Sequence, residues 1–189
     1  MISTLAVVAL CATTAQAADE FNRPGAFVGA GMNYGIPSFQ GAAGADFGNS
    51  LGFNVRGGYR FNEFIAVEGI YEYMDDFGTG RQTVAGTSVT ADAKTNAFSI
   101  NGKLILPLSR FQPYLTGGVG FLNSDAELKI AGQHFNGSGT SFAGRFGAGL
   151  DVFATEHISL YAETAYTMGT DNLSDLYYFN VGWGAKYNF

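Results

Sequence analysis

The sequence predicts an all-β protein whose eight antiparallel strands close into an up-and-down barrel. Three observations lead to this fold class. Apolar and polar residues alternate with a period of two in several segments, which indicates strands with two unlike faces. The connections between these segments are alternately short and long. The chain is also rich in glycine, with 27 residues, and in aromatic residues, at 15%, which suits short barrel strands better than helices.

The first three predicted strands lie in the N-terminal third of the chain. Segment 25–34 (GAFVGAGMNY) has strand length but contains too many small residues for its faces to be separated. Segment 51–61 (LGFNVRGGYRF) alternates cleanly, with its large apolar residues at odd positions. Segment 65–73 (IAVEGIYEY) alternates in the same way, except that Ile70 falls among the polar positions.

The next two strands are predicted at the centre of the chain. Segment 97–106 (AFSINGKLIL) alternates between apolar and polar residues, with Ile105 on the polar side. Segment 113–122 (PYLTGGVGFL) is again rich in small residues and ends on Leu122, a further exception to the alternation. We predict a strand here because glycine permits close packing of neighbouring backbones.

The last three strands complete the predicted barrel. Segments 142–153 (FAGRFGAGLDVF) and 158–168 (ISLYAETAYTM) alternate strongly. The final segment, 179–189 (FNVGWGAKYNF), places a large or apolar residue at every second position up to Phe189. The residues between them are asparagine, lysine and glycine, so this strand has one apolar face.

The connections are expected to sort to opposite ends of the barrel. Tight turns are predicted near 62–63, 107–112 and 154–156. The remaining gaps are long and rich in Gly, Ser, Thr, Asn and Asp, which is typical of loops; they cover 35–50, 74–95, 123–141 and 169–177.

The polar face is predicted to point into the barrel and the apolar face toward lipid. The polar positions hold mainly small residues, which fit a narrow lumen, and their few charges nearly balance, as enclosed charges must. We predict that these charges form a network in the lumen: Arg56, Arg60, Glu68, Glu72, Lys103, Arg145, Asp151, Glu163 and Lys186. In particular, Arg56 and Arg60 are expected to pair with Glu68 and Glu72 across one short turn.

Aromatic residues near the strand ends support a transmembrane barrel, because two aromatic belts mark the two interfaces of a bilayer. One group lies beside the short turns: Tyr59, Phe61, Phe64, Phe111, Phe153, Tyr187 and Phe189. The other lies toward the long loops: Tyr71, Tyr73, Phe142, Tyr166 and Phe179. A soluble barrel that encloses a small apolar ligand is the alternative, and it requires the opposite orientation of the faces.

Residues 1–17 are predicted to be a cleaved signal peptide, followed by the barrel domain over 18–189. A short apolar stretch precedes Ala15 and Ala17, which satisfy the small-x-small cleavage rule and leave Ala18 as the new N-terminus. The only cysteine, Cys11, lies in the removed segment, so disulfide chemistry is not expected in the mature chain.

Three stretches carry a likeness to a known family: PYLTGGVGF, FGAGLDVFATEHISLYAETAYT and GWGAKYNF. In these stretches the predicted mature chain resembles the small eight-stranded outer-membrane barrels of the OmpA-like and opacity-protein-like families. It implies that Trp183, Tyr187 and Phe189 belong to a C-terminal signal read by the barrel assembly machinery of a Gram-negative bacterium. It also implies a location in the outer membrane among lipid and lipopolysaccharide, with both termini and the short turns in the periplasm.

These observations favour a non-enzymatic structural or surface-contact protein. Its long loops would meet a host or phage ligand or support envelope integrity, and its lumen would be plugged by side chains. We expect a monomer without cofactor or metal, and the net charge of −6 argues against nucleic acid as a partner. Two alternatives remain: a small pore, and a lipid-modifying enzyme. The pair His157 and Ser159 resembles that of outer-membrane lipid A deacylases, but it is expected at a periplasmic turn, far from that substrate.

Overall fold

The computed structural model describes residues 20–37, 50–75, 79–84, 87–130, 133–169 and 177–189, and nearly all of them are β-strand. A short 3-10 helix, η2 (Glu20–Asn22), precedes the strands. The strands are β1 (Gly25–Pro37), β2 (Ser50–Arg60), β3 (Ile65–Asp75), β4 (Thr79–Val84), β5 (Thr87–Ile105), β6 (Phe111–Ile130), β7 (Gln133–Phe153), β8 (Ile158–Gly169) and β9 (Tyr177–Asn188). The predicted signal peptide and most of the expected loops at 35–50 and 169–177 lie outside these ranges.

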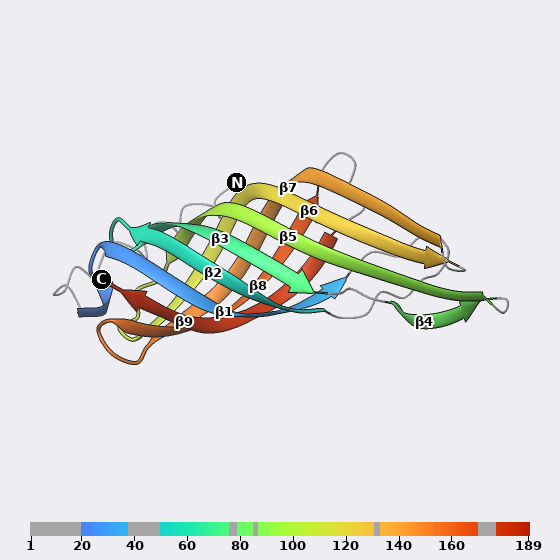
Figure 1. Ribbon diagram of the computed structural model, residues 1–189. Helices are drawn as coiled ribbons and strands as arrows, with labels where there is room; N and C mark the ends of the chain where they lie inside the picture. The colour runs from blue at the N-terminus through green and yellow to red at the C-terminus, as the bar shows by residue number, and fades with distance from the viewer. Residues whose placement is uncertain (1–19, 38–49, 76–78, 85–86, 131–132, 170–176) are drawn as a thin grey trace, which may run out of the picture.

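The predicted eight-stranded antiparallel barrel is confirmed (Figure 1). Each of its strands pairs with its neighbours in the sequence, β4 aside, and the sheet closes where β1 pairs with β9. Strand β4 does not belong to the wall, because β3 pairs directly with β5 over Ile65–Met74 while β4 flanks only the first part of β5. Closure leaves the wall without a free edge, which a barrel in lipid requires.

Two of the expected loops are instead continuations of strands, so those loop predictions were wrong. Strands β5, β6 and β7 extend through much of 74–95 and 123–141, and β6 pairs with β7 from Phe111↔Val152 to Ile130↔Gln133. Antiparallel pairing needs only backbone groups, so polar and glycine-rich sequence can continue a hairpin beyond the wall. These strands project at the end opposite to the C-terminus (Figure 1).

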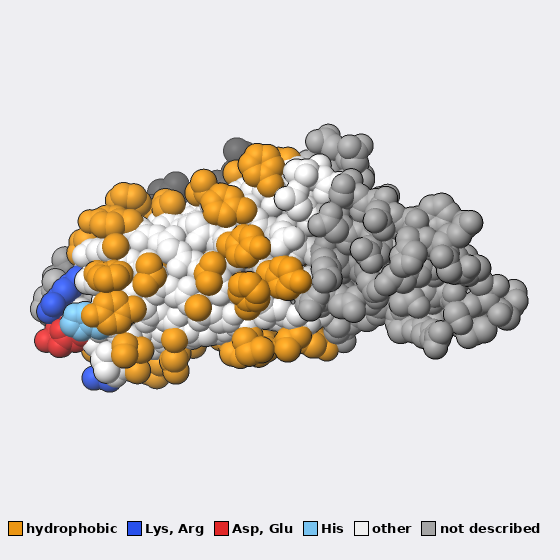
Figure 2. All heavy atoms as spheres, in the orientation of Figure 1, with side chains coloured by type: hydrophobic (Ala, Val, Ile, Leu, Met, Phe, Trp, Pro, Cys, Tyr) orange, Lys and Arg blue, Asp and Glu red, His pale blue; other side chains and the backbone are white. Residues whose placement is uncertain are grey.

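The predicted orientation of the two faces matches the burial of the side chains. Large apolar residues at alternate positions lie on the outer surface, for example Leu115 at 62% exposure and Ile100 at 55%. Figure 2 shows hydrophobic side chains over the barrel wall, while the charged side chains visible in that view gather at its short-turn end. None of the described helical segments is long and apolar enough to cross a membrane.

Aromatic side chains contact one another at two levels of the outer wall. Near the short turns Tyr59 meets Phe61, with ring centroids 5.2 Å apart, and Tyr187 meets Phe189 at 5.0 Å. Toward the long connections Phe121 meets Phe142 at 5.9 Å. Phe153 does not belong to a belt as predicted: it is buried against Phe21, with centroids 5.5 Å apart. The alternation explains this, because Phe153 has the same parity as the inward-facing Asp151.

The residues that broke the predicted alternation face the interior, and two of them, Ile105 and Leu122, belong to apolar clusters there. Ile70 and Leu122 are fully buried and Ile105 is 8% exposed. Toward the short turns lies a cluster of Phe27, Ala66, Ile105 and Tyr114. Toward the projecting strands lies a cluster of Met74, Ala97, Leu122, Ala143 and Tyr178. The alternation therefore holds for these residues, and the interior is less polar than the sequence suggested.

Candidate functional site

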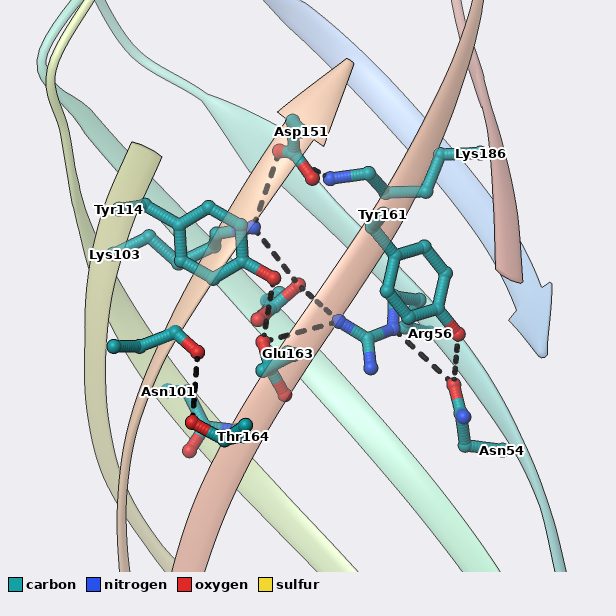
Figure 3. Close-up of polar contacts among 12 residues, drawn as sticks. Asn54, Arg56, Asn101, Lys103, Tyr114, Asp151, Tyr161, Glu163, Thr164 and Lys186 are labelled. Carbon is teal, nitrogen blue, oxygen red and sulfur yellow. Dashed lines mark hydrogen bonds and ion pairs between the residues drawn. The ribbon is translucent and has the colours of Figure 1, made fainter. Parts of the chain in front are cut away.

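The nine charged residues predicted in the lumen, here called the interior charges, are all buried. They come from six strands: β2 carries Arg56 and Arg60, β3 carries Glu68 and Glu72, β7 carries Arg145 and Asp151, and β5, β8 and β9 carry Lys103, Glu163 and Lys186. Each lies at an inward position of its strand, so the period of two brings them into one enclosed space. Figure 3 shows the central part of this arrangement.

Glu163 is the most connected carboxylate of the interior. Its Oε1 accepts hydrogen bonds from Arg145 Nη2 at 3.0 Å and Nη1 at 3.2 Å. Its Oε2 accepts one from the Tyr114 hydroxyl at 2.8 Å and lies 3.4 Å from Arg56 Nη1. The donors belong to three other strands, so Glu163 links the wall of the barrel across its interior, and charged hydrogen bonds of this kind are the stronger ones.

Glu72 is a second hub on the side of the projecting strands. Its Oε1 accepts hydrogen bonds from Arg145 Nη2 at 2.9 Å, Asn180 Nδ2 at 2.9 Å and Asn33 Nδ2 at 3.2 Å. Arg145 thus bridges Glu72 and Glu163. Pairing and hydrogen bonding together are what allow such charges to be buried.

A third group lies toward the short turns, around Asp151. Its Oδ2 accepts hydrogen bonds from Lys103 Nζ at 3.5 Å and from Lys186 Nζ. Lys103 Nζ also lies 3.9 Å from a Glu68 carboxylate oxygen and 3.4 Å from the centroid of the Tyr114 ring. The faces of aromatic rings attract cations, so Tyr114 helps to replace the water that the ammonium group has lost.

The predicted cross-strand pairs are only partly present. Arg56 Nη1 lies 3.8 Å from Glu68, its diagonal neighbour. Arg60 pairs with neither predicted glutamate, and Glu72 pairs across the barrel with Arg145. The register explains the error, because Arg60 lies opposite Ala66, whereas Glu72 lies opposite Asn54. Six residues of strand separate the two positions, about 20 Å.

Arg60 instead holds η2 across the short-turn end of the barrel. Its Nη1 donates to the Phe21 carbonyl at 3.1 Å and to Gln112 Oε1 at 2.7 Å. The remaining N–H groups donate to Asn62, Glu63 and Asn22. All five guanidinium donors therefore bond to neutral acceptors. Gln112 was not predicted as an interior residue because it fell in the turn expected at 107–112, whereas β6 begins at Phe111.

The suspected His157 and Ser159 pair is not arranged for nucleophilic catalysis. His157 is exposed, and its ring stacks on Tyr187 with centroids 5.8 Å apart. Ser159 is fully buried, and its Oγ accepts a hydrogen bond from Asn188 Nδ2 at 3.1 Å. A base and a nucleophile must share a proton and an accessible substrate position, and these two side chains lie in different environments. Within the described residues, no group of three or more His, Cys, Asp or Glu side chains is placed to hold a metal ion.

The residues predicted to form an assembly signal, Trp183, Tyr187 and Phe189, lie on β9 or at its end and are exposed on the outer wall. Ala15, Ala17 and Ala18 lie outside the described residues, as do the side chains of the carboxylates in the projecting strands.

The barrel of this chain is similar to several solved outer-membrane proteins. Neisserial surface protein A is 17% identical, with a TM-score of 0.65 over 88% of this chain and 99% of its own. Ail, the attachment invasion locus protein of Yersinia pestis, is 21% identical, with a TM-score of 0.56 over 88% and 97%. OprG from Pseudomonas aeruginosa is 16% identical, with a TM-score of 0.56 over 90% and 98%. At these identities the likeness shows a common fold.

Sequence comparison leads to the same class. No curated protein matches the chain. The family described as outer membrane protein beta-barrel domain matches residues 3–189, almost the whole chain. The alternating faces, the closed eight-stranded wall and the polar interior are all features of such barrels. The chain therefore belongs to the outer membrane protein β-barrel domain family, and its location is the outer membrane.

Proposed function

We propose that the protein is a non-enzymatic surface-contact protein whose barrel is a plugged anchor and whose projecting strands and loops form the working surface. The observation that carries this proposal is the filling of the interior. The buried interior charges share the lumen with an apolar cluster around Phe27 and Ile105 and with another around Met74 and Leu122. An eight-stranded barrel is narrow enough for side chains to fill it, and this arrangement supports a sealed lumen.

The projecting strands support a contact role. They rise from the end of the barrel opposite to η2 and the C-terminus. We infer that η2, the short turns and both termini face the periplasm, so that β4 and the extensions of β5, β6 and β7 face outward. A rigid scaffold that presents loops is the common arrangement of binding proteins.

The charge of this surface restricts its partner. The solved Ail structure includes a complex with a heparin analogue, sucrose octasulfate. In the present chain, 74–95 and 123–141 together contain the acidic residues Asp75, Asp76, Asp92, Asp125 and Glu127 against the basic residues Arg81, Lys94 and Lys129. Like charges repel, so we infer a neutral or cationic partner rather than a sulfated polyanion.

The contact role is tested by shortening the projecting strands without changing the wall. Replacing 76–93 and 124–139 by tight turns removes these extensions, because the pairs Met74↔Thr95 and Asn123↔Thr140 remain. At equal surface level, cells with the shortened protein are expected to lose attachment to host cells or adsorption of phage. Glu156→Gln at the short-turn rim is the matched control. Unchanged attachment by the shortened protein would refute the contact role.

The plugged lumen is tested separately by single-channel recording of the pure folded protein in a planar bilayer. A sealed interior predicts no steady open conductance. A stable conducting state would favour the small-pore alternative instead, and it would leave the contact role of the projecting strands untouched.

A further inference from the structure

A cavity of about 110 Å³ lies at the short-turn end of the barrel. It reaches from surface residues such as Arg23 and His157 to the buried side chains of Lys103, Asp151 and Lys186. Its walls include Phe27, Ala66 and Ile105. The space is large enough for several water molecules or for one small organic molecule, since about 15 Å³ of such volume holds one water.

The buried charges around this cavity do not balance. Among the described residues, the buried interior contains five cations, Arg56, Arg60, Lys103, Arg145 and Lys186, and four carboxylates, Glu68, Glu72, Asp151 and Glu163. Arg145 and Arg56 pair with Glu163, Glu72 and Glu68, and Glu68 also lies 3.9 Å from Lys103. At the short-turn end the buried Arg60, Lys103 and Lys186 line the cavity together with one buried carboxylate, Asp151. The exposed Glu20, Arg23 and Glu156 also line it, so the lining side chains include four cations and three carboxylates. Uncompensated buried charge is costly, so a monoanion is the complement of this site.

The two lysines also have hydrogen-bond donors to spare. An ammonium group carries three N–H donors. Within the described part of the chain, Lys103 Nζ and Lys186 Nζ each donate one hydrogen bond, and both bonds go to the same oxygen, Asp151 Oδ2. Both lysine residues line the cavity. The donors that remain can thus be satisfied by an acceptor placed there.

We propose that this cavity binds a small organic monocarboxylate. Its carboxylate accepts hydrogen bonds from Lys103 and Lys186, and its short apolar part packs against Phe27, Ala66 and Ile105. The charge requires one negative group, and the apolar walls favour a hydrocarbon part over a fully hydrated inorganic ion. This inference concerns the periplasm-facing end and does not depend on the contact role proposed above.

The test is a titration of the folded protein, in zwitterionic detergent at constant ionic strength, with butyrate, followed by ¹³C-methyl NMR. Ile105 and Ala66 line the cavity, whereas Ile100 lies on the outer wall and is the internal reference. We expect saturable shifts of the Ile105 and Ala66 methyl signals with a dissociation constant of about 1 mM, and no saturable shift of Ile100. Butanol, which has the same tail without the charge, is expected to bind at least about tenfold more weakly.

Variants separate this site from adventitious binding. Lys186→Met is expected to weaken butyrate binding about tenfold or more, because it removes a charged hydrogen-bond donor. Arg110→Gln removes a charge from the same end without lining the cavity and is expected to leave binding unchanged. Ala66→Leu keeps every charge, fills the cavity and is expected to abolish binding, so the test does not depend on the folding of the lysine variant.

Three results would overturn the proposal. The absence of saturable shifts in the wild-type protein would mean that the cavity holds water only. Equal affinity of wild type and Ala66→Leu would place the binding elsewhere. If inorganic phosphate binds as tightly as butyrate, binding depends on negative charge alone and not on contact with the apolar wall.

Discussion

Replacing Glu163 by glutamine tests whether the interior charges hold the barrel together as a network. The substitution keeps the shape of the side chain and removes its charge. Arg145 and Arg56, which contact Glu163 at 3.0 and 3.4 Å, then lose a buried partner. Breaking a buried ion pair on one side costs about 3–5 kcal/mol, because the remaining charge is left uncompensated. Arg145 retains Glu72 and Arg56 retains Glu68, which places the expected loss near the lower limit, about 3 kcal/mol.

The assay is urea unfolding of the protein refolded into lipid vesicles. Trp183 is the only tryptophan and lies on the outer wall, so its fluorescence reports the loss of lipid contact. With a denaturant slope of about 2 kcal/mol per molar urea, a loss of 3 kcal/mol lowers the midpoint by about 1.5 M. The slope itself is expected to stay the same, since the fold is unchanged.

Glu156→Gln is the control for this experiment. Glu156 is exposed at the rim and lies 3.8 Å from Arg23, so its ion pair is screened by water and contributes at most about 1 kcal/mol. The reasoning fails if the Glu163 variant shifts the midpoint no more than the Glu156 variant does. If Arg145 and Glu163 are coupled, the double variant Arg145→Met with Glu163→Gln is expected to lose less stability than the sum of the two single variants.

Three further substitutions address the wall, the close packing of strands and assembly. Ile100→Arg places a charge on the lipid face near the middle of the part of β5 that pairs with β3. It is expected to cost about 2–4 kcal/mol in the same urea assay, whereas an equal midpoint would argue against lipid at this position. Gly31→Ala brings a Cβ against the Trp183 carbonyl and the Tyr161 hydroxyl and is expected to cost about 1–3 kcal/mol. In Gly57→Ala the nearest atom lies 3.8 Å from the new Cβ, so stability should change by less than about 1 kcal/mol. Similar losses in the two variants would contradict close packing at Gly31. Phe189→Ala is expected to lower the amount of heat-modifiable protein in the outer membrane. The urea midpoint is expected to stay the same, because the side chain is 70% exposed. Phe111→Ala, at 58% exposure, is the control, and equal yields of the two variants would remove Phe189 from the assembly signal.

The wall of the barrel could be predicted because one local rule decides it. The period of two assigns each side chain to lipid or lumen, and it placed Arg145, Glu163 and Lys186 inward before any pairing was known. The extent of the strands could not be predicted in this way. Beyond the wall neither face needs to be apolar, so the composition of 123–141 reads as loop although its backbone pairs as β6 and β7. Pairing there depends on backbone hydrogen bonds, which the amino-acid pattern does not record.

The sequence predicted which charged residues lie inside the barrel but not which of them pair with each other, for a geometric reason. Whether a side chain enters the lumen depends on its odd or even position along the strand. Its level along the barrel axis depends on the register of every intervening strand and on the closure of the barrel. Arg145 and Glu72 are 73 residues apart and lie on β7 and β3, which do not pair with each other, yet they meet across the lumen. Arg60 and Glu72 are close in sequence and on adjacent strands, yet the hairpin register separates them. The same reasoning explains why the cavity at the short-turn end was not predicted. Lys103, Lys186, Asp151 and Arg60 form one group only when their levels along the barrel axis are known. The surplus positive charge at this end becomes apparent only from that grouping. A sequence method would therefore have to fix the register of every strand pair and the closure of the barrel before it could recover these levels.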